Sequence, residues 1–332
     1  MAGNVVVNPG LAADVQSAVP TSDECDQYKI GILNCQSAVN KTALIHDLIY
    51  DRQLDALFLT ETWFNDDTPS ADINKVAPPD YKVLHVPRAL TSGGLYRGGG
   101  LAVVYHQSAV VQHHPFTDDA EQHRQPPKCE MQLVRLGLPP RTHAVIHVYR
   151  PRRMSLVKEF VDELSQVITV LNENKDCDDN ILLCGDVNCS GNNKSLLDSH
   201  LEKALEELNL TQFVNSPTHG NNLLDILASS DSSLVSTVTV DDAGRISDHR
   251  LITANITTGK HFNSCRLPKP TSNWLSKEAV AAKSERSRLE SQWLKTNNHR
   301  DFMVYRRACQ YANEQIKKSY NEHLKKQQPH KR

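Results

Sequence analysis

Three short motifs in this chain contain acidic, amide and histidine side chains of the kinds that hydrolyse phosphodiesters. Glu61 lies in Thr60-Glu61-Thr62 at the end of an apolar run, Asp186 lies in Gly185-Asp186-Val187-Asn188, and Ser247-Asp248-His249 follows further along. The reaction needs a hard cation to neutralise phosphate oxygens, a group that orients and deprotonates water, and donors for the charge that develops at phosphorus. Together the motifs indicate metal-assisted phosphodiester hydrolysis.

The residue types suit these tasks. Carboxylates such as Glu61 and Asp248 suit Mg²⁺, which proteins bind through one or two acids plus waters and substrate oxygens. Asp186 can hold a water, Asn188 can donate to a phosphate oxygen, and His249 can bind phosphate as a cation or move a proton. The sequence has no Cys₄ or His-Glu-x-x-His spacing, which disfavours zinc. We therefore expect Mg²⁺ as the cofactor, with Mn²⁺ as an alternative.

Further polar residues extend these motifs into an ordered set. The six motifs contain Asn34, Glu61, Tyr149, Asp186 with Asn188, Asp225, and Ser247-Asp248-His249. One motif is weak evidence, because a single Asp-x-Asn is usually a turn or helix cap and a single buried His or Tyr is usually a core residue. Six motifs in this order are strong evidence. Over residues 27–258 the chain resembles the endonuclease/exonuclease/phosphatase superfamily, in the style of the apurinic-type endonucleases of non-LTR (LINE-like) retrotransposons.

The resemblance implies a role for each residue. Asn34, Glu61 and Asp248 would surround the metal, and Asp186 would position the attacking water. A metal-dependent DNA endonuclease that nicks one strand is the function implied, and its product would have a 3′-hydroxyl suited to priming.

The remaining motif residues would act on the phosphate. Asn188 and Tyr149 would contact the scissile phosphate, and Asp225 would accept a hydrogen bond from the His249 ring and fix its tautomer. Further substrate contacts are expected from Thr218, Arg97, Arg150 and Ser247.

Apolar runs and amphipathic stretches predict an α/β fold. Strands are expected over 29–33, 55–60, 81–86, 101–106, 131–136, 143–149, 180–185, 223–228, 235–240 and 251–256, and helices over 42–50, 155–172 and 195–208. The resemblance implies two stacked mixed β-sheets flanked by helices, a four-layer, deoxyribonuclease-I-like arrangement with a helical C-terminal tail. All the proposed ligands would then lie at one edge.

We expect three regions along the chain: a mobile leader over 1–26, the nuclease domain over 27–258 and a basic helical tail over 259–332. Residues 266–332 hold 16 Lys and Arg against 6 Asp and Glu, so the remainder holds 21 against 33. The tail resembles the linker to a reverse transcriptase that is absent here. It could bind phosphates, in which case its removal would weaken DNA binding and leave the catalytic centre intact, or it could be a solvated linker.

Composition favours an enzyme that is not secreted. Mean hydropathy is −0.48, and no apolar run approaches the roughly 18 residues of a membrane span. The eight cysteines form no Cys-x-x-Cys pair and the first residues do not resemble a secretory signal, so we expect a nuclear or cytoplasmic protein with reduced thiols. DNA is the expected partner, no membrane is expected, and the oligomeric state stays open.

Two other functions compete with DNA nicking. The chain could be another phosphodiesterase or phosphatase of the same superfamily, acting on phosphoinositides, sphingomyelin or poly(A). It could also be an inactive retroelement remnant that binds nucleic acid. The sequence disfavours a lipid hydrolase, since it contains no apolar lid or membrane segment, and the intact set of polar ligands argues against decay.

Overall fold

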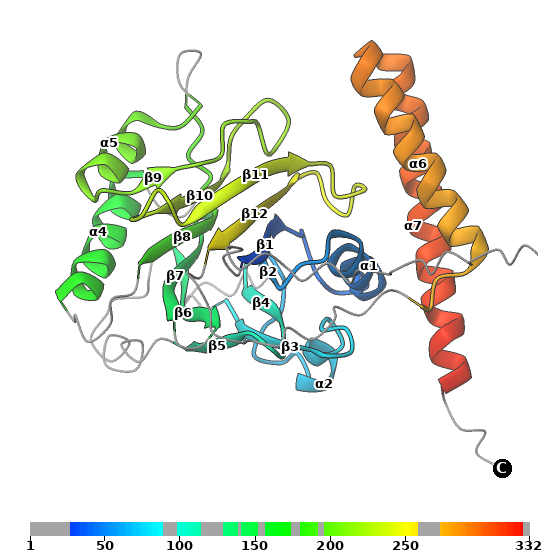
Figure 1. Ribbon diagram of the computed structural model, residues 1–332, viewed down its shortest axis with the longest axis horizontal. Coiled ribbons are helices and arrows are strands. Elements are labelled where there is room, and N and C mark those ends of the chain that lie inside the picture. Colours follow the sequence, from blue (N-terminus) through cyan, green and yellow to red (C-terminus); the bar gives the residue numbers. More distant parts are fainter. Residues whose placement is uncertain are drawn as a thin grey trace, which may run out of the picture.

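The computed structural model describes residues 27–88, 98–113, 129–138, 141–151, 157–173, 180–191, 196–257 and 273–327 (Figure 1). The expected leader, 1–26, and Arg97 lie outside these ranges.

Two six-stranded sheets form the centre of the molecule. The first has the order β11 (Val235–Asp241), β12 (Leu251–Thr257), β1 (Gln27–Asn34), β2 (Ala56–Thr60), β4 (Leu101–His106) and β3 (Tyr81–Val86). The second has the order β5 (Val110–His113), β6 (Glu130–Leu138), β7 (Arg141–Tyr149), β8 (Ile181–Asp186), β10 (Asp225–Ser229) and β9 (Thr211–Gln212). Each is mixed, because β1 pairs in parallel with β2, and β7 with β8. The predicted pair of mixed sheets is confirmed.

The alternation of side chains between the two faces of the central strands explains how the sheets stack. Successive side chains of a strand point to opposite faces. On β2, Phe58 points between the sheets, where its ring meets that of His147 from β7 at 5.2 Å between centroids. Its neighbours Leu57 and Leu59 belong to a second cluster on the outer side of the first sheet. These strands are buried on both faces, which is why they read as continuous apolar runs.

Helices cover the outer faces of both sheets (Figure 1). α1 (Thr42–Arg52) and α2 (Ser70–Asn74) accompany the first sheet, and α4 (Val157–Glu173) and α5 (Ser199–Glu207) accompany the second. The helix expected over 195–208 starts later, at Ser199. Asp198 has an extended backbone and accepts a hydrogen bond from the His200 amide at 2.9 Å, so it caps the helix.

The C-terminal tail is a long helical hairpin of α6 (Lys277–Thr296) and α7 (His299–Gln327) that stands beside α1 (Figure 1). Trp274 and Ile316 are buried in the same cluster as the apolar side chains of α1. The His46 ring of α1 meets the Tyr320 ring of α7 edge-on, 5.3 Å between centroids. The hairpin is therefore docked on the α/β body.

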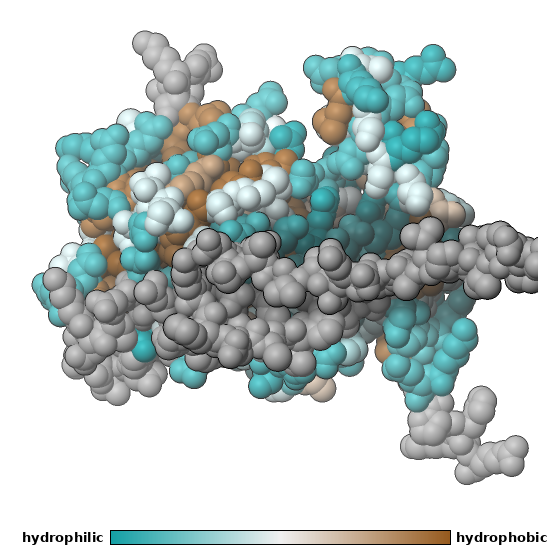
Figure 2. Space-filling model, in the orientation of Figure 1, coloured by the Kyte–Doolittle hydropathy of each residue, from teal (hydrophilic) through white to brown (hydrophobic). Residues whose placement is uncertain are grey.

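Hydrophilic side chains cover most of the hairpin in Figure 2. Among the described residues, no helix combines the length and apolarity needed to cross a bilayer. The cysteines in the described ranges are buried and form no disulfide with one another: Cys35, Cys129, Cys184, Cys189 and Cys309.

Candidate active site

Strand register brings the polar motif residues to one edge of the two sheets. Asn34 ends β1 and pairs with Thr60, the last residue of β2, so Glu61 follows immediately beside it. In the second sheet Asp186 pairs with Tyr149 on one side and with Asp225 on the other. Parallel strands end at the same edge, which places residues far apart in sequence side by side.

A hydrogen-bond network joins the two sheets at this edge. The Asn34 amide nitrogen donates to Glu61 Oε1 at 3.0 Å and to Asp186 Oδ2 at 2.7 Å. The Tyr149 hydroxyl donates to the same Glu61 oxygen at 2.9 Å. Four of the residues identified in the sequence thus form one contiguous polar cluster.

Unusual backbone conformations hold two of these motifs. Glu61 has φ +54° and Asn188 has φ +48°, in the left-handed region that non-glycine residues rarely adopt. The segment after Glu61 is fixed by backbone bonds from Thr62 to the Gly100 carbonyl at 3.1 Å and from Trp63 to the Gly99 carbonyl at 2.8 Å. Such conformations often mark functional sites, where surrounding contacts offset a cost of about 1–3 kcal/mol each.

His249 and Asp225 form a buried pair. The His249 Nδ1 atom lies 2.7 Å from Asp225 Oδ2, with side-chain exposures of 7% and 0%. Burial disfavours the charged ring, but the hydrogen bond to Asp225 and the nearby charges of Asp225, Asp186 and Asp248 outweigh it and raise the pKa of His249 to about 9. The ring is therefore held as an imidazolium near neutral pH, suited to contact a phosphate oxygen.

Asp186 is fully buried beside this pair. Burial and then the charge of Asp225 raise the pKa of Asp186 well above its ordinary value. Its Oδ1 accepts the Asn188 backbone amide at 3.0 Å, which fixes the carboxyl group. A carboxylate whose pKa is raised is a stronger base, so Asp186 is suited to take a proton from water.

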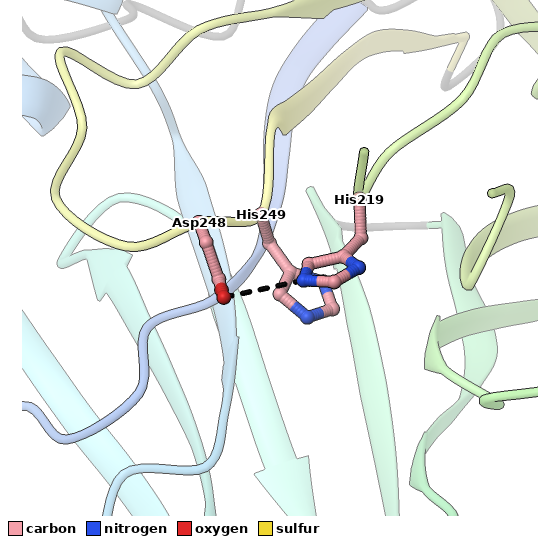
Figure 3. A group of neighbouring side chains, drawn as sticks. All are labelled: His219, Asp248 and His249. Atoms are coloured by element: carbon pink, nitrogen blue, oxygen red, sulfur yellow. Dashed lines mark hydrogen bonds and ion pairs between the residues drawn. The ribbon is translucent and has the colours of Figure 1, made fainter. Parts of the chain in front are cut away.

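His219 is a site residue that the sequence reasoning missed. Its Nε2 atom lies 3.2 Å from Asp248 Oδ2, and its ring is 4.7 Å from that of His249 between centroids (Figure 3). Partial burial acts to raise the pKa of Asp248, but the hydrogen bond and charge of His219 outweigh it and lower this pKa. The only sequence signal was its place directly after Thr218.

The donor set fits a hard divalent cation. Mg²⁺ takes one or two carboxylates together with amide or water oxygens, and Glu61, Asp248 and Asn34 supply these atom types. Burial lowers the pKa of Lys41, and the charges of Asp248 and Glu61 act against this shift, so both carboxylates lie within electrostatic range of the same ammonium. His219, Asp248 and His249 also offer ligand atoms within 4.8 Å of one another. The roles of Asn34, Glu61 and Asp248 as metal ligands stay a prediction.

Two of the residues expected to bind substrate, Thr218 and Ser247, make hydrogen bonds within the protein. Thr218 is fully buried, and its hydroxyl accepts the amides of Leu224 and Asp225, each at 3.0 Å. The Ser247 hydroxyl donates to the Asn34 carbonyl at 2.6 Å. Both residues brace the site, and their contact with substrate stays a prediction.

Arg150 also makes hydrogen bonds within the protein. Its side chain is 3% exposed, and its Nε donates to the Val187 carbonyl at 2.6 Å. The Asn188 side-chain amide donates to the Arg150 carbonyl at 3.0 Å. These bonds hold the Asp186–Asn188 turn against the end of β7, and the contact of Arg150 with substrate stays a prediction.

Solved nucleases and a phosphatase share this fold. The endonuclease domain of TRAS1, a telomere-specific non-LTR retrotransposon, has a TM-score of 0.52 and 15% identity over 70% of this chain and 99% of that chain. The AP endonuclease LMAP from Leishmania major has a TM-score of 0.52 and 15% identity, covering 70% and 88%. The 3′ phosphatase NExo from Neisseria, bound to a product DNA hairpin, has a TM-score of 0.50 and 17% identity, covering 69% and 99%.

Sequence comparison gives the family. No curated protein sequence matches the chain. The profile of the Endonuclease/Exonuclease/phosphatase family matches residues 32–249, from within β1 to His249. This span includes every motif residue described above, and the chain belongs to the endonuclease/exonuclease/phosphatase family.

Proposed function

We propose that the protein is a Mg²⁺-dependent DNA endonuclease that nicks one strand by phosphodiester hydrolysis. The observation that supports this most directly is the polar cluster that links Asn34, Glu61 and Asp186 across the two sheets. Beside it lies the buried His249–Asp225 pair. A base, a cationic donor and hard oxygen ligands are therefore adjacent, which is what the reaction requires.

Each group has a distinct task in this mechanism. Glu61, Asp248 and Asn34 would hold the metal, which when bound neutralises phosphate oxygens. Asp186 takes a proton from the attacking water, whose oxygen forms a bond to phosphorus while the bond from phosphorus to the 3′-oxygen breaks. The 3′-oxygen leaves with the electron pair of that bond and takes a proton from solvent, which gives the 3′-hydroxyl. His249, held as a cation by Asp225, donates to a non-bridging phosphate oxygen and stabilises the charge that develops there.

DNA as the substrate is supported by two features. The motif order resembles that of LINE-like retrotransposon endonucleases, and the fold is shared with an endonuclease domain of such an element and with an AP endonuclease. A phosphatase also has this fold, so hydrolysis of another phosphate ester is the competing outcome.

The deciding experiment is incubation of supercoiled plasmid with purified protein in Mg²⁺, Mn²⁺ or EDTA. Conversion to open circles with either metal, and none in EDTA, is expected. DNA ligase should reseal the product only if the nick has a 3′-hydroxyl and a 5′-phosphate. Asp66→Ala removes an exposed aspartate in the loop after Glu61, outside the proposed site. It serves as a control for the loss of an acidic side chain and should nick normally. Hydrolysis of phosphoinositides without plasmid nicking would replace this function with the competing one.

A further inference from the structure

The segment 242–250, between β11 and β12, determines where Asp248 and His249 lie. Its C-terminal half is anchored to the nuclease body. The Ser247 hydroxyl donates to the Asn34 carbonyl at 2.6 Å, and the Arg250 amide donates to the Thr218 carbonyl at 2.7 Å. These bonds fix the end of the segment that enters β12.

The N-terminal half of this segment is held by the C-terminal hairpin. The Asn313 side-chain amide on α7 donates to the Gly244 carbonyl at 2.9 Å. Ile316, one turn further along α7, is 1% exposed and buried in one cluster with Ala243 and Ile246. The hairpin therefore supplies both polar and apolar contacts to the chain just before Ser247.

Gly244 fits this contact because it lacks a side chain. Its φ is +66°, which glycine adopts without strain. A Cβ atom at this position would overlap the Arg286 guanidinium of α6. The Arg245 guanidinium lies 5.8 Å from the centre of the Phe302 ring of α7. The backbone of the segment and the surface of the hairpin are thus shaped to each other.

The hairpin is itself fixed to the body, so it can hold the segment 242–250 in one position. Lys283 of α6 is 15% exposed, and its ammonium lies 2.6 Å from Asp47 and 3.0 Å from Asp51 of α1. The Ser319 hydroxyl of α7 donates to the Trp274 carbonyl at 2.8 Å and accepts the Ser276 amide at 2.6 Å. These contacts tie α6 to α1, and α7 to the residues that lead into α6.

We propose that the α6–α7 hairpin is a positioning element of the active centre and that Asn313 is its positioning residue. This rests on the proposed function, because it takes Asp248 to be a metal ligand. Asn313 holds the Gly244 carbonyl, four residues before Asp248. Without that bond the chain before Ser247 is less restrained, so the hydrogen bond from Ser247 to Asn34 opens more often and Asp248 leaves its place beside His219 more often. Groups hydrogen-bonded directly to metal ligands typically change metal affinity by about 10–100-fold. Asn313 acts through the segment that carries the ligand, so we expect the lower end of this range, at least about tenfold weaker binding.

The test is Mn²⁺ binding by the full chain, measured by electron paramagnetic resonance, alongside the Mn²⁺ concentration that gives half-maximal plasmid nicking. Asn313→Ala is compared with Gln310→Ala, an exposed amide on the same helix. Alanine favours helix over asparagine by about half a kcal/mol, which offsets part of the roughly 1 kcal/mol of a lost hydrogen bond. Asn313→Ala should therefore remain folded, with a thermal midpoint close to wild type.

We expect Asn313→Ala to bind Mn²⁺ at least about tenfold more weakly and Gln310→Ala to bind it normally. Gly244→Ala disturbs the same contact from the segment side and should weaken binding in the same direction. Unchanged Mn²⁺ affinity in folded Asn313→Ala overturns the proposal, whether or not the protein nicks DNA. If wild type binds Mn²⁺ in an Asn313-dependent way but cleaves no plasmid, the positioning role stands and the proposed endonuclease function fails.

Discussion

Asp225→Asn tests the central electrostatic feature of the site. The substitution preserves size and a hydrogen-bond acceptor but removes the charge 2.7 Å from His249 Nδ1. With a pKa of about 9, the ring of His249 is an imidazolium in nearly all molecules at pH 7.5. Without the carboxylate, the largest influence that raises the pKa of His249 is gone, while burial still lowers it. This pKa should therefore fall to or below the ordinary value of about 6.5.

The expected loss of nicking activity follows from the pKa of His249 in the wild type and in Asp225→Asn. At pH 7.5 a group with a pKa of about 9 is protonated about 30 to 1, and one with a pKa of about 6.5 is deprotonated about 10 to 1. The active fraction therefore falls about tenfold. The amide can also stabilise the wrong tautomer, and loss of a carboxylate from a comparable triad costs as much as about 10⁴ in rate. We expect a defect of at least about tenfold, with little change in DNA affinity.

The assay is single-turnover nicking across pH at saturating Mg²⁺. The required form of His249 is protonated, so activity is lost as pH rises through its pKa. Wild type should retain activity until about pH 9, whereas Asp225→Asn should lose it above about pH 6.5, and the deficit should narrow in acid. Asp198→Asn is a matched control, since Asp198 also lies beside a histidine, His200, at 3.3 Å, but at the surface and with no part in the proposed mechanism. Coincident pH profiles for wild type and Asp225→Asn would refute the reasoning, as would an equal loss in a His249→Ala background.

Three further predictions concern the base, the hairpin and acid stability. Asp186→Ala and His249→Ala should each lower nicking by at least about 10²-fold in single-turnover assays, with circular dichroism unchanged. A chain truncated to 1–265 should lose about 3 kcal/mol or more of unfolding free energy in urea titrations, because Ile316 and Trp274 leave the core and Asp47 loses its buried cation. Burial lowers the pKa of His46 to about 4, so the unfolded chain binds a proton that the native one excludes, and stability should fall as pH drops from about 6.5 to about 4, by up to about 1.4 kcal/mol per pH unit. His46→Gln should flatten this slope in denaturant titrations at pH 5 and pH 7.

The predicted truncation result differs from what charge alone suggested. A basic tail that only contacts phosphates could be removed without harm to the catalytic centre. The contacts of Asn313 with Gly244 and of Lys283 with Asp47 argue otherwise. Charge counts cannot distinguish a cation that faces solvent from one that pairs across 236 residues of sequence.

The strands and their ends were predictable because their pattern is local. Buried strands read as apolar runs, and a polar residue just beyond such a run marks the edge of a sheet, as at Asn34, Glu61 and Asp186. The contact of His219 with Asp248 was not predictable, since it depends on how two loops meet. The inward orientation of Arg150 also depends on the shape of a turn, Asp186–Asn188, whose left-handed residue gives no pattern in sequence.

Opposite charges on body and tail explain how such a site can depend on a distant hairpin. The body outside residues 266–332 has 12 more acidic than basic residues, and the tail has 10 more basic than acidic ones, which follows from 33 against 21 and 16 against 6. Lys283 directs part of this attraction to two acids of α1, and burial of Ile316 beside Ile246 makes the contact specific. Electrostatic attraction alone tolerates many orientations, whereas a buried side chain and the Asn313 hydrogen bond tolerate few. The hairpin is thereby held in one position, against the segment that presents Asp248.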